Sequence, residues 1–267
     1  MKTLHETEWN DEEKFLKEFN QLKYFNGNVH PHLVTLLATF TFQKKYHFLF
    51  PYAQCDLEHY WEREFPQQQP FDITRVRWFS RQVCGLMGAI HAIHNPLHIQ
   101  DKYGRHGDLK PDNILWYRCT NDDLGMFVVS DMGLSDLHRE GSRSNIPNHS
   151  IPATPGYRPP ECDIDGGTIS RAYDIWTLGC LFIDMVVWFV GGFPLLQKFI
   201  EARMEVVYIL TGVTNTIFFD LKEFKPDGEN VQGSIKHVVQ IKPQVFKVNT
   251  DKLSFRMELS LTFSLVV

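Results

Sequence analysis

The stretch RHGDLKPDNIL, at residues 105–115, holds the side chains best suited to chemistry. Asp108, Lys110 and Asn113 lie two and then three residues apart, and Pro111 interrupts any regular helix or central strand there. We therefore expect a loop. An acid, an amine and an amide on one short loop can orient a hydroxyl, neutralise a phosphate and ligate a metal ion, which are the tasks of phosphoryl transfer.

A second carboxylate follows an apolar strand further along the chain. The segment MFVVS, residues 126–130, ends directly before Asp131, and residues 121–125 predict a turn ahead of it. This order of strand, turn, strand and acid brings Asp131 beside the loop at 105–115, as a metal-bound phosphate requires.

Three upstream segments have the patterns of elements that position such a loop. Residues 11–25 carry an apolar side chain at every third or fourth position, which is the period of an amphipathic helix. Residues 40–53 (FTFQKKYHFLFPYA) predict two strands that meet at a Lys-Lys turn, the second ending at Pro51. A further helix with a core-facing apolar stripe begins near Asp72 or Thr74, and either residue is a suitable cap.

The composition is that of an ordinary globular protein. The 267 residues are 43% hydrophobic and 22% charged, and the net charge of -5 gives no support for a nucleic-acid binder. The five cysteines form no C-x-x-C pair, so we expect reduced thiols in an intracellular protein, cytoplasmic or nuclear. The N-terminal segment has no apolar run typical of a signal peptide.

One apolar run, LGCLFIDMVVWFVGGFPLL at residues 178–196, is long enough to span a membrane. Asp184 lies near its centre, and a charge at that depth costs about 3 kcal/mol in a bilayer. We therefore expect a buried helix and no membrane partner, with a membrane-anchored protein as the disfavoured reading.

Four motifs in succession resemble the eukaryotic protein kinase superfamily, of the serine/threonine type and a fungal-like branch. The loop described first resembles the H-R-D-L-K-x-x-N catalytic loop, with Gly107 in place of the arginine. Asp131, followed by Met and Gly, resembles the D-F-G motif. ATPGYRPPE at 153–161 resembles the end of an activation segment, and SRAYDIWTLGC at 170–180 resembles the start of a helix whose aspartate, here Asp174, holds the catalytic loop in the family.

The resemblance implies a role for each residue of the loop. Asp108 would accept the proton of a substrate hydroxyl, Lys110 would stabilise the γ-phosphate of ATP, and Thr154 would hydrogen-bond both. Asn113 and Asp131 would hold Mg²⁺, so the implied cofactors are ATP and Mg²⁺ and the implied partner is a protein substrate.

The resemblance also assigns the segment after the second strand to the nucleotide base. Phe50 would be the gatekeeper, the carbonyl of Pro51 and the amide of Ala53 would face adenine, and Asp56 would approach the ribose. For Asp56 the residues alone favour a helix cap equally, and the two roles are compatible.

Glu18 falls where the family places the glutamate of its αC helix. From spacing alone it is equally one solvated charge among several, but the junction at residues 30–34, which resembles H-P-N-I-V, favours the family role. No G-x-G-x-x-G motif and no V-A-I-K-like lysine precedes Glu18, and Lys2, in MKTLH, lacks the pattern of a strand with a partner.

The implied fold is α+β and bilobal, like that of protein kinases. An incomplete N-lobe, with the αC helix and strands 4 and 5, would occupy residues 1–53, and a mostly α-helical C-lobe residues 54–242. Residues 243–267 alternate like a strand and form an atypical tail. Within the C-lobe, residues 135–152 predict a mobile loop and residues 214–224 a loop with a short helix.

Two functions from different classes follow. The first is a serine/threonine protein kinase, favoured because Asp108, Lys110, Asn113 and Asp131 are all present. The alternative is a catalytically impaired pseudokinase or scaffold fragment that binds partners, with or without nucleotide, and transfers no phosphate. It is favoured by the missing glycine motif and lysine.

Overall fold

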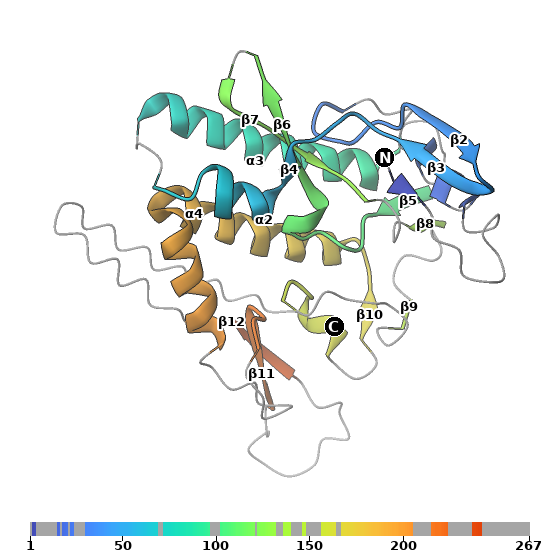
Figure 1. Cartoon of the computed structure of the whole chain (residues 1–267). Coiled ribbons are helices and arrows are strands. Elements are labelled where there is room, and N and C mark those ends of the chain that lie inside the picture. Colours follow the sequence, from blue (N-terminus) through green and yellow to red (C-terminus); the bar gives the residue numbers. More distant parts are fainter. Residues whose placement is uncertain are drawn as a thin grey trace, which may run out of the picture.

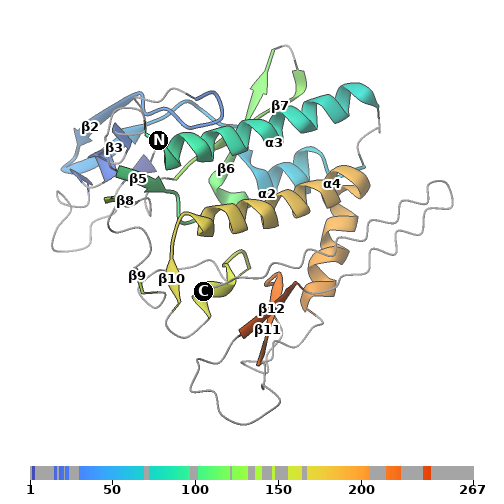
Figure 2. The ribbon, with the colours of Figure 1, turned by 180° about the vertical axis from the view of Figure 1, so that it is seen from behind.

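The structure is a computed structural model with two long helices, α3 and α4, lying side by side and small sheets around them (Figures 1 and 2). It describes residues 2–3, 15–16, 18–20, 22–23, 30–68, 72–96, 102–120, 122–131, 136–139, 146–147, 156–163, 167–204, 215–223 and 237–241. This mixture of helix and sheet agrees with the expected fold class.

A three-stranded sheet forms the N-terminal part of the described chain. β2 (Ala38–Phe42) and β3 (Lys45–Leu49) make the predicted antiparallel hairpin, and β1 (Lys2–Thr3) pairs with the other edge of β3. Gln43 and Lys44 form the turn, one position earlier than predicted, with φ of 48° and 62°, the left-handed values of a tight hairpin turn. The expectation that MKTLH has no strand partner is wrong, because β3 supplies one.

The predicted amphipathic helix is confirmed in its described part, since residues 15–16, 18–20 and 22–23 are helical. Phe15 stacks on Tyr46 with ring centroids 4.3 Å apart and lies 5.2 Å from Phe48. The helix therefore packs its apolar side on β3.

A short connection leads from this sheet to the helices. It contains β4 (Cys55–Asp56), α2 (Leu57–His59) and a π-helical turn (Tyr60–Glu64). The carboxylate of Asp56 accepts the N–H of His59 at 2.8 Å, so Asp56 caps α2, as one of its two expected roles required.

α3 (Ile73–His94) begins as predicted next to Asp72, whose carboxylate accepts the N–H of Arg75 at 2.9 Å. Asp72, rather than Thr74, is therefore the N-cap. The helix packs on β7 and ends beside β5, where it meets the functional loop.

Two glycines on α3 leave space for two histidines of the segment that joins the predicted amphipathic helix to β2. A Cβ atom on Gly85 would lie 2.2 Å from the ring of His32, and one on Gly88 would lie 2.6 Å from the ring of His30. His32 also contacts the carbonyl of Phe127 through Nδ1 at 2.6 Å. Both histidines therefore fit only because the helix lacks side chains there.

β4, β6 (Ile114–Cys119) and β7 (Asp122–Val129) form a second antiparallel sheet in the order β4-β6-β7. Cys119 pairs with Asp122, so the chain reverses where a turn is predicted, but the turn is shorter than the predicted range 121–125, because residues from Asp122 onward belong to β7. Gly125 has φ of 68° inside β7 and misled the prediction; a Cβ atom there would lie 2.3 Å from the Trp116 ring nitrogen.

α4 (Ala172–Met204) confirms the predicted buried helix and bends at Gly192, whose φ is 70°. By length and apolar composition alone it would suffice to cross a membrane. Its buried Asp184, however, accepts Arg203 Nη1 at 2.8 Å and the hydroxyl of Tyr157 at 2.7 Å. A charge paired in this way, within apolar packing, identifies α4 as a helix of the protein core.

Three further strand pairs surround these elements. β5 (Lys102–Arg105) pairs with β8 (Asp136–Arg139), and β9 (Ile146–Pro147) pairs with β10 (Thr168–Ile169). The prediction that residues 135–152 lack regular structure is therefore wrong at two places, because partners far along the chain supply the hydrogen bonds.

The last described pair joins β11 (Phe219–Glu223) to β12 (His237–Ile241). The short helix expected at residues 214–224 is therefore wrong, since Phe219 and Leu221 alternate with charged residues at the period of a strand. The tail at 243–267 lies outside the described residues.

Candidate functional site

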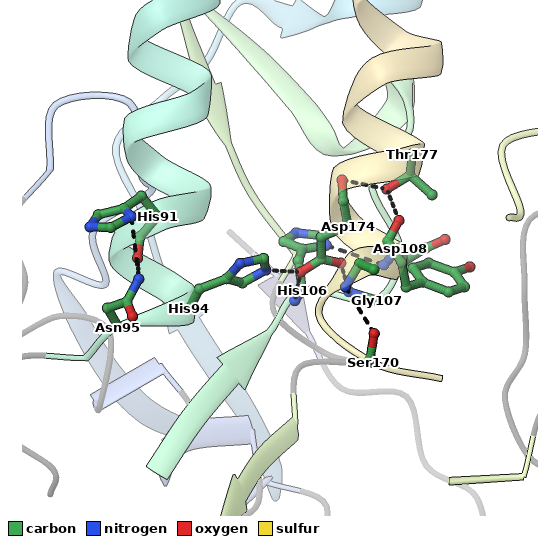
Figure 3. A network of polar contacts seen from close by, with 11 residues as sticks. His91, His94, Asn95, His106, Gly107, Asp108, Ser170, Asp174 and Thr177 are labelled. Carbon is green, nitrogen blue, oxygen red and sulfur yellow. Dashed lines mark hydrogen bonds and ion pairs between the residues drawn. The ribbon is translucent and has the colours of Figure 1, made fainter. Parts of the chain in front are cut away.

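The loop singled out by the sequence runs from the end of β5, through a short 3-10 turn (Pro111–Asn113), into β6. Asp174, fully buried in the first turn of α4, lies next to His106 and Gly107 of this loop (Figure 3). Its carboxylate accepts the N–H groups of His106 at 2.8 Å and Gly107 at 2.9 Å. Gly107 has φ of 81°, a left-handed value that glycine adopts without steric cost. The expected contact between Asp174 and the loop is confirmed.

A third donor to Asp174 comes from the end of α3. His94, its last residue, contacts the Asp174 carboxylate through Nε2 at 2.8 Å (Figure 3). Burial on its own raises the pKa of Asp174, but the hydrogen bond from His94 and the loop amides outweigh it and hold the pKa below its ordinary value. The carboxylate is therefore ionised at neutral pH and ties α3, the loop and α4 together.

His106 connects the loop to the end of β7. Its Nδ1 accepts the N–H of Asp108 at 3.2 Å, so the proton lies on Nε2, which donates to the carbonyl of Ser130 at 2.8 Å. Ser130 in turn donates its N–H and its hydroxyl to the carbonyl of Asn113, at 2.8 and 3.0 Å. Both ends of the loop are thereby fixed to one strand.

The three predicted loop residues are in direct contact. Asp108 Oδ2 lies 3.0 Å from Lys110 Nζ and 2.9 Å from Asn113 Nδ2, which also donates to the Asp108 carbonyl at 2.7 Å. Both amide hydrogens of Asn113 are engaged, so its Oδ1 is the atom that can face a cation. The side chains of Asp108 and Lys110 keep 15% and 24% of their surface exposed, which leaves them accessible to a substrate.

Asp131 lies at the same end of the β6-β7 pair as Asn113, because the register sets Ile114 opposite Val129. It is exposed and has φ of 54°, a left-handed value that aspartate tolerates better than most residues. Among the described residues no group of three or more His, Cys, Asp or Glu is placed to hold a metal. One amide oxygen and one carboxylate suit Mg²⁺ shared with substrate phosphates, since this ion keeps few protein ligands.

The residues expected to face a nucleotide base lie on the connection between β3 and α2. Phe50 is half-buried with its ring 6.4 Å from that of Phe48, Pro51 is exposed and Ala53 is half-buried. The carbonyl of Pro51 accepts the hydroxyl of Tyr117 at 3.2 Å. No local pattern predicts this contact, because Tyr117 lies on β6, 66 residues further along the chain.

The remaining expected residues are Glu18 and Thr154. Glu18 is half-buried on the helix of residues 15–23. Thr154 lies outside the described residues. Lys2 lies on β1 with its Cα opposite that of Phe48. His94, His106 and Ser130 were not anticipated, although a histidine in the last turn of a helix was a signal for a contact there.

An acid paired with a lysine and an asparagine, a second acid at the same end of the β6-β7 pair and a buried aspartate that binds the loop backbone are typical of the protein kinase class. A family model described as the protein kinase domain matches residues 1–239. The chain belongs to the protein kinase family.

Curated relatives agree at low identity. The chain is 26% identical over 226 residues to cyclin-dependent kinase 14 of Mus musculus, which covers 82% of this chain and 42% of the relative. It is 24% identical over 172 residues to the serine/threonine-protein kinase crk1 of Schizosaccharomyces pombe, covering 64% of this chain and 45% of the relative. The matched part spans less than half the length of each relative.

Proposed function

We propose that this chain transfers the γ-phosphate of ATP to serine or threonine hydroxyls of a protein substrate. The contact of Asp108 with both Lys110 and Asn113, on a loop fixed by Asp174, carries the proposal. Such a site needs no covalent intermediate, because positioning and charge neutralisation supply most of the rate in phosphoryl transfer.

Asp108 orients the substrate hydroxyl and accepts its proton, and Lys110 neutralises charge on the phosphate being transferred. Thr154 is proposed to hydrogen-bond both. Asn113 and Asp131 hold Mg²⁺, which when bound offsets the negative charge of the phosphates. The proximity of Asn113 to the end of β7 supports this pairing.

The base and ribose lie along the connection after β3. The carbonyl of Pro51 and the amide of Ala53 bind the adenine edge, with Phe50 behind it. Asp56 contacts the ribose with the carboxylate oxygen that does not cap α2, and the cap at 2.8 Å supports this by holding the side chain in place.

Lys2 and Glu18 are proposed as the lysine and glutamate of the nucleotide site. The pairing of β1 with β3 supports Lys2, because its Cα lies opposite Phe48, two residues ahead of Phe50. Replacing Lys2 with methionine is expected to lower phosphate transfer at least tenfold, because the charge that would neutralise the phosphates is lost. The melting temperature of the variant checks that it remains folded.

Nucleotide binding is tested by thermal stabilisation. At one hundred times its Kd, Mg²⁺-ATP is expected to stabilise the chain by about 2.7 kcal/mol. Asp131→Asn should abolish the Mg²⁺-dependent part, whereas Asp123→Asn, an exposed change on β7, the strand that precedes Asp131, should leave it unchanged. Absence of any shift at millimolar Mg²⁺-ATP would contradict the proposal. Binding without phosphate transfer would instead support the binding-only alternative.

A further inference from the structure

The segment proposed to face the base is held from one side by β6. The N–H of Gln54 donates to the carbonyl of Trp116 at 3.0 Å, and the Gln54 side chain accepts the N–H of Arg118 at 2.7 Å. Between these two backbone contacts, the hydroxyl of Tyr117 donates to the carbonyl of Pro51 at 3.2 Å. Three consecutive residues of β6 therefore form hydrogen bonds with the segment at residues 51–54.

Tyr117 lies on the half-buried face of β6, the strand that follows the catalytic loop. Ile114 and Trp116 are buried, whereas Leu115 and Tyr117 are half-buried on the opposite face. Asn113 lies in the 3-10 turn that leads directly into β6. One strand therefore connects the proposed metal ligand to the residue that contacts the Pro51 carbonyl.

In the contact between Tyr117 and Pro51, Tyr117 is the donor and the Pro51 backbone can only accept. Proline has no N–H, so the only backbone hydrogen-bonding group of Pro51 is its carbonyl, which can accept two hydrogen bonds. Partial burial raises the pKa of Tyr117, so its hydroxyl keeps its proton and remains a donor at neutral pH. Tyr117 occupies one acceptor position of this carbonyl and orients the other.

We propose that Tyr117 is a positioning residue that sets the selectivity of this site for adenine over 6-oxopurines. The inference rests on the proposed function, because it assumes that the Pro51 carbonyl receives the purine. A carbonyl held in one orientation accepts the 6-amino group of adenine and repels the 6-oxygen of hypoxanthine. Without the Tyr117 hydroxyl the peptide group of the Pro51 carbonyl can rotate. The carbonyl then repels the 6-oxygen of hypoxanthine less strongly.

The test compares the binding of Mg²⁺-ATP and Mg²⁺-ITP to the full chain and to Tyr117→Phe, which removes only the hydroxyl. The ATP-to-ITP affinity ratio is expected to fall about three- to tenfold, the effect of one hydrogen bond of ordinary strength. Tyr52→Phe is the matched control, because Tyr52 is the neighbour of Pro51 and is 83% exposed. Gln54→Leu removes the hydrogen bond from the N–H of Arg118 and should also lower the ATP-to-ITP affinity ratio.

The outcomes separate the two proposals. A wild-type chain that binds neither nucleotide would contradict the proposed function itself. A wild-type chain that prefers ATP, with the same preference in Tyr117→Phe, would overturn the role of Tyr117. Equal losses of ATP and ITP affinity would also overturn it, because a merely structural contact weakens both. Tighter ATP binding by the variant would show that the hydroxyl competes with the base, which is the opposite of the proposal.

Discussion

Asp174 is the residue on which the site depends most. Three groups donate to its carboxylate: the ring of His94 at the end of α3 and the N–H groups of His106 and Gly107 in the loop. A buried carboxylate is costly unless it is hydrogen-bonded, and here two of its donors belong to the backbone directly ahead of Asp108.

Replacing Asp174 with asparagine is expected to lower the free energy of unfolding by about 3 kcal/mol, because the amide turns a donor toward groups that are donors themselves. Urea denaturation measures the loss. Asp163→Asn is the matched control, since Asp163 pairs with Arg158 at 2.9 Å nearer the surface, and a loss of about 1 kcal/mol or less is expected there. Equal losses in the two variants would contradict the role given to Asp174.

At this scale the sequence predicts what lies within one motif. Asp108, Lys110 and Asn113 were predicted together because their spacing on one short loop brings them into contact. The contacts of His94 with Asp174 and of Tyr117 with Pro51 join residues 80 and 66 positions apart, and local pattern carries no record of such partners.

Among the elements, α3 shows how a helix makes room for its neighbour. Gly85 and Gly88 each cost helix stability, but they admit the rings of His32 and His30. The close approach fixes the junction between the N-terminal sheet and the helices.

Gly85→Ala is expected to destabilise the chain by about 1–3 kcal/mol, because the new Cβ atom would strike the His32 ring. Gly179→Ala in α4 is the control, since a Cβ atom there meets nothing within 4 Å. That variant is expected to gain about 0.5–1 kcal/mol from helix propensity. Thermal unfolding of both reports the difference, and stabilisation by both would refute the packing described for α3.

The helices and the β2-β3 hairpin were predictable because their apolar periods are strong. β8, β9 and β11 were not, because each is short and depends on a partner elsewhere in the chain. Gly125 led to the opposite error, because a glycine there predicts a turn. In the structure it lies within β7, where the lack of a side chain leaves space for the Trp116 ring.

On the scale of the whole molecule, His30 and His32 link the N-terminal sheet to α3 and β7. Their rings lie 6.0 Å apart, and burial lowers the pKa of both below the ordinary value of 6.5. The unfolded chain therefore binds protons at these sites more readily than the folded chain does. Their contribution to stability is fully present above pH 6.5 and is lost as the pH falls below it.

His32→Asn isolates this contribution, because asparagine can still donate to the carbonyl of Phe127 but does not titrate. The free energy of unfolding of the wild type, relative to that of the variant, is expected to fall between pH 7.5 and 5.5. Denaturation at both pH values measures it. A difference independent of pH would show that the histidines do not couple the junction to protonation.

We propose that the loop bound by Asp174 catalyses phosphate transfer. The most direct measurement is Mg²⁺-dependent transfer of labelled phosphate from ATP to a mixed basic protein substrate, by the wild type, Asp108→Asn and Asp112→Asn. Asp112 is an exposed acid on the same loop and controls for the loss of charge. We predict that Asp108→Asn lowers transfer by at least a hundredfold and that Asp112→Asn retains most of it. Equal transfer by the wild type and Asp108→Asn would contradict the claim.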